Sequence, residues 1–405
     1  MKFIHLSDLH LGKRVFEFSM IEDQKYILQQ ILDWMEEEQP DGVILAGDLY
    51  DKPVPSGEAV QLFDWFLTEL AERNVTVLAI SGNHDSAERI AFGAGLMSGR
   101  NVHFSPVYDG NIKCVTMEDG FGPVHVWLMP FVKPAVVRQA LREEDEQAVE
   151  VKSMHAIEQE SAANATDEKV QSAAKSIQGY QSAVEAVVQR MNVNPEERNV
   201  LVSHQFVTGA ARCESEEINV GGLDQISGET FDDFDYVALG HIHSPQRIGR
   251  ETVRYCGTPL KYSFSEAEQT KSMTVVEMKE KGKVEIRTIP LRPLRDMRKI
   301  RGTYMELMDS ASYKDTNPLD YVQITLTDEE DIPDGLQKLR IVYPNVMQLN
   351  YDNLRTQTNQ EITALEEMEQ KSEMELFEEF FELQNNQAMS EEQREFVGEL
   401  IEKLR

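Results

Sequence analysis

The sequence predicts a layered α/β protein with a small second domain and a helical tail. From residue 1 to about residue 290, short β-branched and aliphatic runs alternate with helical patterns, which is typical of layered α/β domains. After Pro290 a shorter strand, helix and strand pattern follows, and beyond residue 352 the chain becomes helical and acidic. With 405 residues the chain exceeds what one hydrophobic core usually serves, so two or three domains are expected.

Seven short apolar runs predict the strands of the first domain, which we place at residues 1–289. Between them, Ser19 followed three residues later by Glu22 predicts a capping box that begins the first helix. A second helix is expected after Pro55. The predicted strands span residues 3–6, 43–46, 75–80, 124–129, 200–203, 236–239 and 274–278.

Residues 139–198 are rich in Ala, Gln and Glu, and no strand pattern occurs before Asn199. Apolar side chains recur here at helical spacing, so we expect a long helix that packs one apolar stripe and has a structural role. The stripe consists of Tyr180, Val184, Val187, Val188 and Met191.

Residues 290–352 predict a small α+β domain that begins with a linker at residues 290–293 and contains strands at 321–326 and 346–349. The tail, residues 353–405, predicts two short amphipathic helices, and a capping box at Ser390 and Gln393 begins the second. Such helices have little core of their own, so they either dock on the main body or bind a partner groove. Their apolar stripes are Met374, Leu376, Phe377, Phe380, Phe381 and Leu383, and Phe396, Val397, Leu400, Ile401 and Leu404.

The composition excludes several classes of protein. Hydrophobic residues make up 41% of the chain and charged residues 27%, which favours a packed core over wholesale disorder. No apolar run reaches about 18 residues and Asp8 interrupts the N-terminus, so we expect a cytoplasmic protein without a membrane span or signal peptide. Cys114, Cys213 and Cys256 lie far apart, which indicates neither a disulfide framework nor a thiolate zinc site.

The formal net charge of −31 argues against a nucleic acid held by bulk electrostatics. Residues 350–405 hold 15 acidic and 5 basic residues, a net charge of −10, so the remainder still carries −21. Any DNA partner would therefore need local compensation.

Five short polar motifs each follow a predicted strand, where open α/β sheets gather their ligand-binding groups. In extended backbone, residues i and i+2 point to one side, so Asp8 with His10 and His241 with His243 can each present a pair of ligands. The motifs are Asp8-Leu9-His10, Gly47-Asp48, Gly82-Asn83-His84-Asp85, Ser203-His204 and Gly240-His241-Ile242-His243.

The donor types in these motifs indicate a divalent metal centre. Carboxylate, imidazole and amide donors without thiolate suit Mn²⁺, Fe²⁺ or Zn²⁺, and the oxygen share favours Mn²⁺. Asp48, alone in its motif, is the natural bridge between two ions. Asp-x-His, Gly-Asp or Ser-His alone is weak evidence, whereas Gly-Asn-His-Asp and Gly-His-x-His are more specific. The other histidines, His5, His103, His125 and His155, are interpreted as ordinary core or surface residues.

At these motifs the sequence resembles the calcineurin-like metallophosphoesterase superfamily, and longer runs resemble its bacterial SbcD family, nuclease subunits that work with the SMC-like ATPase SbcC. The resemblance implies a layered sandwich of two central β-sheets flanked by helices, a capping domain that touches DNA, and a tail that binds the SbcC coiled coil. The runs are MKFIHLSDLHLGKR, GNHDSAERIAFG, VGGLDQ and FDDFDYVALGHIHSPQRIGRETVRYCGTPLKYSFSE.

The resemblance also implies roles for individual residues. Two Mn²⁺ ions are implied, with Mg²⁺ or other divalent ions as substitutes, and His84 is implied as the catalytic histidine that stabilises the transition state and protonates the leaving oxygen. Asp85 either orients His84 or caps the helix before Ser86. Other branches of the family carry His where this chain has Asp51, so the strand-positioning role of that histidine is not transferred. The implied ligands are Asp8, His10, Asp48 and His243 for one ion, and Asp48, Asn83, His204 and His241 for the other.

The implied activity is Mn²⁺-dependent DNA cleavage in repair, recombination and replication: a 3′ to 5′ exonuclease on duplex ends and an endonuclease on single strands or hairpins. A homodimer within a heterotetramer with SbcC, in the nucleoid-associated cytoplasm, is implied as well. Lys13, Arg14 and Arg89 are candidates for the local positive charge, and we expect weak, salt-sensitive DNA binding without SbcC. Two alternatives stay open: a metal-dependent phosphodiesterase for small nucleotides, and a non-catalytic scaffold for SbcC.

Overall fold

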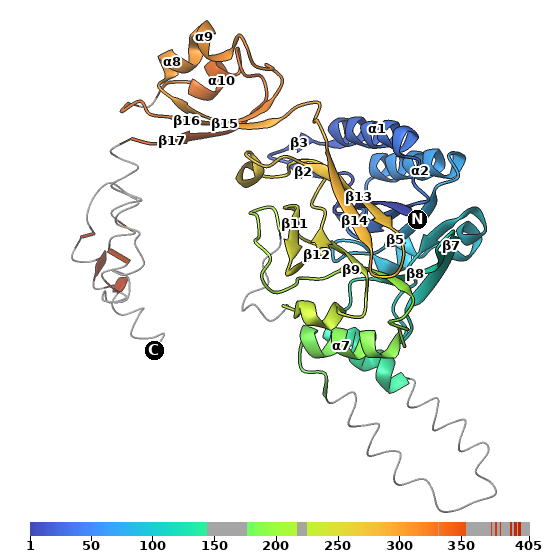
Figure 1. The fold of residues 1–405 in the computed structure, drawn as a ribbon. Coiled ribbons are helices and arrows are strands. Elements are labelled where there is room, and N and C mark those ends of the chain that lie inside the picture. Colours follow the sequence, from blue (N-terminus) through green and yellow to red (C-terminus); the bar gives the residue numbers. More distant parts are fainter. Residues whose placement is uncertain are drawn as a thin grey trace, which may run out of the picture. The chain divides into compact units, whose positions relative to one another are not determined.

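Two six-stranded sheets form the body of the first unit of the chain (Figure 1). The computed structural model describes residues 1–143, 176–216, 225–330, 332–353 and scattered positions between 374 and 397. The chain divides into two units, Met1–Arg298 and Lys299–Arg405. None of the helices within the described ranges is both long and apolar enough to cross a membrane.

The first sheet has the strand order β14-β13-β1-β4-β5-β6. Its strands β1, β4, β5 and β6 run parallel, β13 pairs antiparallel with β1, and β14 pairs antiparallel with β13. The four parallel strands therefore end at one edge of the sheet. The strands are β1 (Lys2–Leu6), β4 (Gly42–Ala46), β5 (Thr76–Ile80), β6 (Val102–Phe104), β13 (Ser272–Met278) and β14 (Val284–Pro290).

The second sheet has the order β11-β12-β10-β9-β8-β7. Here β8, β9, β10 and β12 run parallel, while β7 and β11 pair antiparallel at the two edges. The strands are β7 (Lys113–Asp119), β8 (Gly122–Met129), β9 (Arg198–His204), β10 (Tyr236–Gly240), β11 (Gln246–Ile248) and β12 (Arg250–Tyr255).

An apolar layer joins the two sheets face to face. Phe3, Ile44 and Leu78 of the first sheet belong to one buried cluster with Val126 and Val202 of the second. The central parallel strands β1, β4, β9 and β10 are buried along nearly their whole length, as strands covered on both faces are. The predicted sandwich of two central sheets flanked by helices is confirmed.

Helices cover the outer faces of the sandwich (Figure 1). Helices α1 (Ile21–Glu38) and α2 (Gly57–Glu72) are the long helices of the first half, and α7 (Tyr180–Arg190) packs in the apolar cluster of the second sheet. The remaining short elements of this unit are β2 (Arg14–Val15), β3 (Phe18–Ser19), α3 (Ala87–Ile90), α4 (Ala94–Met97), the 3-10 turns η1 (Ser98–Arg100), η2 (Gly228–Phe231) and η3 (Phe264–Glu266), and a helical stretch at residues 134–143.

The capping box predicted at Ser19 and Glu22 is wrong. Ser19 lies in β3, where it pairs with Arg14 of β2, so it is part of a small hairpin rather than a helix cap. Helix α1 begins at Ile21, and its N-cap residue Met20 provides no side-chain cap. The helix predicted after Pro55 is confirmed by α2, which begins at Gly57.

The stripe predicted on a long helix is confirmed for its described part, because Val184 and Val187 of α7 are fully buried. The intervening residues 144–175 lie outside the described residues. The predicted linker begins one residue too early, since Pro290 still belongs to β14.

The second unit contains a three-stranded sheet in the order β15-β16-β17, with β16 and β17 parallel. Its core includes Val322, Ile324 and Leu339, all fully buried. The elements are β15 (Met297–Gly302), α8 (Tyr304–Met308), α9 (Ser310–Tyr313), β16 (Tyr321–Leu326), α10 (Gly335–Leu339) and β17 (Val346–Tyr351).

The capping box predicted in the tail is confirmed. The Ser390 backbone N–H donates to Gln393 Oε1 at 3.0 Å, and the Gln393 N–H donates to Ser390 Oγ at 3.3 Å. Phe377 and Phe396, one from each predicted stripe, are 40% and 64% exposed. The stripe residues Leu376, Phe380, Leu383, Leu400, Ile401 and Leu404 lie outside the described residues.

Candidate metal centre

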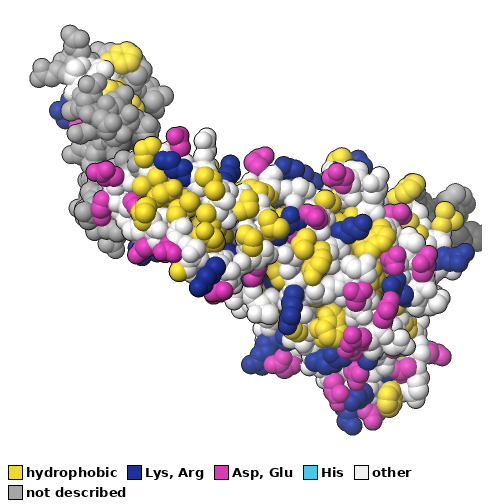
Figure 2. All heavy atoms as spheres, turned by 90° about the horizontal axis from the view of Figure 1, so that it is seen from above, with side chains coloured by type: hydrophobic (Ala, Val, Ile, Leu, Met, Phe, Trp, Pro, Cys, Tyr) yellow, Lys and Arg dark blue, Asp and Glu magenta, His cyan; other side chains and the backbone are white. Residues whose placement is uncertain are grey.

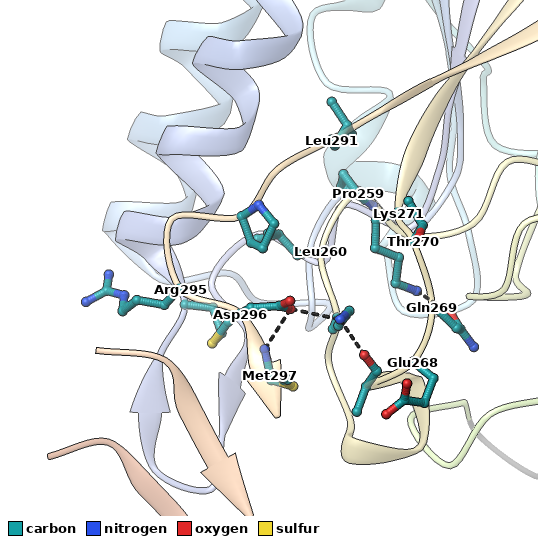
Figure 3. A pocket seen from close by; sticks show the side chains of 14 residues that line it. Pro259, Leu260, Glu268, Gln269, Thr270, Lys271, Leu291, Arg295, Asp296 and Met297 are labelled. Carbon is teal, nitrogen blue, oxygen red and sulfur yellow. Dashed lines mark hydrogen bonds and ion pairs between the residues drawn. The ribbon is translucent and has the colours of Figure 1, made fainter. Parts of the chain in front are cut away.

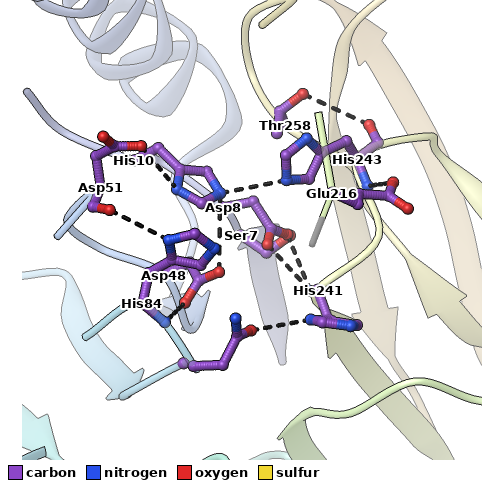
Figure 4. Close-up of polar contacts among 12 residues, drawn as sticks. Ser7, Asp8, His10, Asp48, Asp51, His84, Glu216, His241, His243 and Thr258 are labelled. Carbon is purple, nitrogen blue, oxygen red and sulfur yellow. Dashed lines mark hydrogen bonds and ion pairs between the residues drawn. The ribbon is translucent and has the colours of Figure 1, made fainter. Parts of the chain in front are cut away.

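The two sheets present the predicted site residues at the carboxyl ends of their central parallel strands (Figure 4). From the first sheet, Asp8 and His10 follow β1, Asp48 follows β4, and Asn83 and His84 follow β5. From the second, His204 ends β9, and His241 and His243 follow β10. The structure therefore brings all eight predicted residues into one cluster.

One half of the cluster is built around His10. Its Nε2 lies 3.2 Å from His243 Nε2 and 3.7 Å from Asp48 Oδ2. Asp8, His10 and His243 each offer a ligand atom, and these atoms lie within 4.8 Å of one another. All four side chains are at most 2% exposed.

The other half is built around Asn83. Its Oδ1 lies 3.0 Å from His204 Nε2 and 2.9 Å from His241 Nδ1. His204 Nε2 is also 3.2 Å from Asp48 Oδ2, so Asp48 lies between the two halves. The Asp8 carboxylate accepts the backbone N–H of His241 at 3.0 Å, which ties the two sheets together at this point.

Four of these residues adopt a strained backbone conformation. Asp8, His10, Asp48 and His241 have φ values of 52°, 44°, 49° and 99°, a region that residues other than glycine seldom occupy. Such strain costs of order 1–3 kcal/mol per residue and gathers at functional sites. The fold therefore holds these side chains in place against a local cost.

Glycines before the site residues allow the sheets to approach closely. A Cβ on Gly240 would lie 1.9 Å from the carbonyl oxygen of Ala46, and one on Gly47 would lie 2.4 Å from His204 Nδ1. Gly47 also has a φ of 89°. Only glycine at these two positions lets His204 reach Asp48.

Burial and mutual charge set the protonation of the cluster. Burial raises the pKa of Asp8 to about 7. Burial also disfavours the charged form of Asp48, but the His204 charge outweighs it and holds the pKa of Asp48 well below its usual range. Burial opposes the charged form of His204, whereas Asp48 raises its pKa to about 9. His204 and Asp48 thus each favour the charged form of the other where the two halves of the cluster meet.

His10 and His243 have the opposite tendency. Burial, as the largest cause, lowers the pKa of each well below its ordinary value, so both imidazoles are neutral at physiological pH. A neutral imidazole has a free lone pair, which metal binding requires. Oxygen and nitrogen donors, without sulfur, therefore converge in a buried space that fits hard or intermediate divalent cations.

His84 lies beside the cluster and is only half-buried. Its backbone N–H donates to Asp48 Oδ1 at 2.9 Å, and its Nδ1 lies 3.1 Å from the carbonyl oxygen of Asp51. The His84 ring stands edge-on to the His10 ring, with centroids 4.8 Å apart. His84 is thus held at the rim of the cluster by the loop after β4.

Asp85 does not cap the helix, contrary to one of its two predicted roles. The cap of α3 is Ser86, whose Oγ accepts the Arg89 N–H. The Asp85 carboxylate accepts the backbone N–H groups of Leu49, Tyr50 and Gly82 at 2.9–3.0 Å. It therefore ties the loop after β4 to the loop after β5.

The three cations that we expected near the motif loops differ in their surroundings. Lys13 forms an ion pair with Asp51 at 2.7 Å. Arg14 donates to the carbonyl oxygen of Glu17, and Arg89 is exposed on α3. Sequence reasoning missed Arg212, whose guanidinium lies 3.6 Å from the ring centroid of Phe206, itself a neighbour of His241.

Buried residues that sequence reasoning also missed hold the Asp8-to-His10 segment in place. Gln24 of α1 donates from Nε2 to the carbonyl oxygen of His10 at 2.7 Å, and its Oε1 accepts the Gly12 N–H at 3.0 Å. Tyr262 donates to the carbonyl oxygen of Leu9 at 2.6 Å. No pattern around Gln24 reveals this role, whereas Tyr262 belongs to the run YSFSE.

A separate group of missed residues supports His243. The Glu216 carboxylate accepts the His243 backbone N–H at 2.7 Å. Lys271 donates to the His243 carbonyl oxygen at 2.9 Å and forms a buried ion pair with Glu266 at 2.5 Å. Glu216 and Lys271 lie 27 and 28 residues from His243, so no local sequence pattern links them to it.

A cavity of about 290 Å³ lies in the first unit apart from the cluster (Figure 3). None of the eight predicted site residues lines the cavity. Lys271, which donates to the His243 carbonyl oxygen, is one of the residues that line it. Its other cations have acidic partners: Lys261 pairs with Asp296 at 2.8 Å, and Arg295 pairs with Asp23 at 2.9 Å. The cavity is therefore not part of the candidate metal centre.

Comparison with known protein families identifies two regions of the chain. A model of the calcineurin-like phosphoesterase family matches residues 1–245. A second model, described as the type 5 capsule protein repressor C-terminal domain, matches residues 293–385. The first match contains every residue of the cluster described above.

Curated relatives match nearly the whole chain. The SbcD subunit of nuclease SbcCD from Staphylococcus epidermidis is 28% identical over 405 residues, which cover 99% of this chain and 98% of the relative. Its counterpart from Staphylococcus saprophyticus subsp. saprophyticus is 31% identical over 353 residues, 86% of this chain and 84% of the relative. Among solved structures, a dimetal phosphatase from Danio rerio is 10% identical and covers 73% of this chain and 98% of its own, with a TM-score of 0.38, too low to support a conclusion.

Proposed function

We propose a function from the premise that this chain belongs to the calcineurin-like phosphoesterase family and, within it, to the family of SbcD subunits of nuclease SbcCD. The function is metal-dependent hydrolysis of DNA phosphodiester bonds in concert with SbcC. The observation that carries it is the convergence of carboxylate, imidazole and amide donors from both sheets, with His84 at their rim.

The donors divide into two overlapping sets that fit two divalent cations. Asp48 is common to both sets because its carboxylate lies between His10 and His204. The oxygen share of the donors favours Mn²⁺. When bound, two such ions polarise a phosphodiester and lower the pKa of a bound water. The first set is Asp8, His10, Asp48 and His243, and the second is Asp48, Asn83, His204 and His241.

The side chain of His84 acts on the substrate in this proposal. Its backbone N–H is anchored on Asp48, and its Nδ1 is held at the Asp51 carbonyl oxygen. Since a carbonyl oxygen only accepts, this contact places the proton on Nδ1 in the neutral ring. When the ring also carries a proton on Nε2, it can donate that proton to the leaving oxygen, which is typically worth 10²- to 10⁴-fold in rate.

Replacing His84 by Ser tests this role. We expect the Mn²⁺-dependent nuclease rate on linear duplex and hairpin DNA to fall by about 10²-fold or more, with Mn²⁺ binding retained. His125→Ser is the matched control, because His125 of β8 contacts Thr116 of β7 and Glu197, just before β9, and has no part in the cluster. An unchanged rate in His84→Ser contradicts the catalytic role, and rapid hydrolysis of small phosphodiesters with intact DNA contradicts DNA as the substrate.

DNA binding in this proposal relies on local groups. On the face shown in Figure 2, basic and acidic side chains are interspersed, so no broad basic surface attracts DNA there. Arg212 over Phe206 and Lys133 over Phe131 place two cations on rings that neighbour His241. We therefore expect DNA affinity that falls steeply between about 50 and 200 mM salt when SbcC is absent.

We assign the tail at residues 353–405 to SbcC binding and residues 290–352 to a capping domain that touches DNA. The exposure of Phe377 and Phe396 supports a partner surface on the tail. Changing both to Glu should abolish SbcC association and leave the nuclease rate on short DNA unchanged. Phe121→Glu, at a residue 55% exposed in the β7–β8 turn, is the control. Retained SbcC association would contradict the assignment.

We propose that the enzyme acts in the cytoplasm, associated with the nucleoid. We also propose that it forms a homodimer within a heterotetramer with SbcC. Phe92 and Leu96, 82% and 87% exposed in the segment that follows the His84 loop, offer apolar surface for the second copy. Replacing both by Ser should convert the dimer to a monomer in analytical ultracentrifugation. A dimer that persists in this variant would contradict the use of this surface.

A further inference from the structure

The imidazole of His243 contacts a serine on the side away from the cluster. Its Nδ1 lies 2.7 Å from Ser215 Oγ, while its Nε2 lies 3.2 Å from His10 Nε2 inside the cluster. Ser215 in turn contacts Glu266 Oε1 at 2.6 Å. The three side chains form a continuous line from a buried carboxylate to the candidate metal centre.

The donor and acceptor of each hydrogen bond along this line follow from the carboxylate of Glu266 at its far end. Glu266 is fully buried, and its carboxylate accepts from the Lys271 ammonium at Oε2, at 2.5 Å, and from Ser215 at Oε1. An ionised carboxylate only accepts hydrogen bonds, so Ser215 must donate its single proton to it. The oxygen of Ser215 is then an acceptor, and His243 must donate from Nδ1.

We propose that Ser215 and Glu266 are positioning residues that keep the proton of His243 on Nδ1 and leave the Nε2 lone pair free for a divalent cation. This inference rests on the proposed function. A carboxylate or carbonyl behind a ligating histidine commonly fixes the tautomer and raises ligand basicity. Here the serine transmits the orientation between carboxylate and imidazole.

His204 supplies an internal comparison. Its Nδ1 lies 2.8 Å from the carbonyl oxygen of Ala46, which also only accepts, so Nδ1 carries the proton and Nε2 faces Asp48 and Asn83. A backbone carbonyl oxygen, rather than a side chain, thus keeps the proton of His204 on Nδ1. A side-chain substitution at Ser215 should weaken binding at the His243 side of the cluster without touching the His204 side.

A second serine provides a matched control. Ser263 Oγ also donates to Glu266 Oε1, at 3.0 Å, and this hydrogen bond lies outside the line to the imidazole. If Ser215 only satisfied Glu266, then removing either hydroxyl would have the same consequence. If Ser215 orients His243, only its own removal alters metal binding.

The test measures Mn²⁺ binding to the full-length, chelator-treated chain by isothermal titration calorimetry. We expect Ser215→Ala to weaken the His243-side affinity about 10-fold or more, Ser215→Thr to restore it to within about 2-fold, and Ser263→Ala to leave it within about 2-fold. Thermal melting establishes that each variant is folded. Unchanged affinity in Ser215→Ala, or an equal loss in Ser263→Ala, overturns the inference.

The tautomer itself gives a second measurement that needs no variant. Imidazole ¹⁵N chemical shifts of the metal-free chain should show His243 protonated at Nδ1 and bare at Nε2, and the reverse assignment overturns the inference. A wild-type chain that takes up no Mn²⁺ refutes the proposed function and the inference with it. Mn²⁺ uptake by the wild type with unchanged affinity in Ser215→Ala refutes the inference alone.

Discussion

Gln24 offers a sharp test of how the fold supports the metal centre, because both the N–H and the oxygen of its side-chain amide form hydrogen bonds with the backbone of one loop. Its Nε2 donates to the carbonyl oxygens of His10 and Leu9, and its Oε1 accepts the Gly12 N–H. Replacement by Met keeps the length and the apolar packing of the side chain while removing every one of these hydrogen bonds.

The magnitude follows from the groups left without a partner. The Gly12 N–H loses its acceptor, at a cost of about 1–3 kcal/mol if it finds no water. The carbonyl oxygen of His10 keeps the Lys13 N–H at 3.0 Å and that of Leu9 keeps Tyr262, so each loses only a net hydrogen bond of about 1 kcal/mol or less. We therefore expect Gln24→Met to lower the free energy of unfolding by about 2–4 kcal/mol.

The variant should also weaken Mn²⁺ binding, because the left-handed conformation of His10, with a φ of 44°, loses one of its restraints. Urea unfolding measures the stability and calorimetric titration measures the metal affinity. Gln29→Met is the matched control: Gln29 lies exposed on the same helix and its amide donates to Asp33 one turn further along, so about 0.5 kcal/mol or less should be lost. A Gln24→Met variant as stable as this control would refute the reasoning.

Three further predictions concern packing, metal and pH. Gly240→Ala should destabilise the chain by about 3 kcal/mol or more in urea, because its Cβ would meet the Ala46 carbonyl oxygen at 1.9 Å, and near-native stability would contradict the close approach of the sheets. Mn²⁺ at about 100 times its dissociation constant should add about 2.7 kcal/mol to the free energy of unfolding, reversed by a chelator and reduced in Asp48→Asn; an unchanged free energy would contradict a metal site in the folded chain. Burial, with the Arg254 charge, lowers the pKa of His5 to about 3 in the folded chain. His5 therefore takes up a proton at higher pH in the unfolded chain than in the folded chain, so the free energy of unfolding falls as the pH drops below the ordinary histidine value of 6.5. Between about pH 7.5 and 5.5 the wild type should lose about 1.4 kcal/mol more than His5→Asn, and equal losses would contradict the burial of a neutral His5.

The parallel strands β1, β4, β9 and β10 could be predicted from the sequence because both of their faces are covered, which makes them continuous apolar runs such as residues 43–46. Among the missed strands, β7 and β14 lie at sheet edges, where half-buried and exposed residues alternate and charged residues interrupt the apolar pattern. The missed strand β12 (Arg250–Tyr255) lies inside the second sheet, but exposed and half-buried residues interrupt it in the same way. The prediction of a capping box at Ser19 was wrong for a different reason: Ser19 lies in β3, which pairs with β2, so this residue belongs to a hairpin that ends before the helix begins.

The site could be predicted where donors follow strands directly, since parallel strands bring their carboxyl ends to one edge. The sequence therefore indicated Asp8, Asp48 and His204 together. The supporting residues could not be predicted, because Gln24, Ser215 and Glu266 act through single hydrogen bonds between segments distant along the chain. Such contacts depend on the packed fold and leave no periodic pattern.

The division of the donors between two sheets has a consequence for synthesis of the protein. Asp8 and His241 are separated by 233 residues, so the donors of the second sheet are synthesised after those of the first. On the proposed function, a chain that stops before β9 (Arg198–His204) carries none of the donors of the second sheet, which are His204, His241 and His243. Such an unfinished chain cannot assemble either ligand set and is expected to have no nuclease activity.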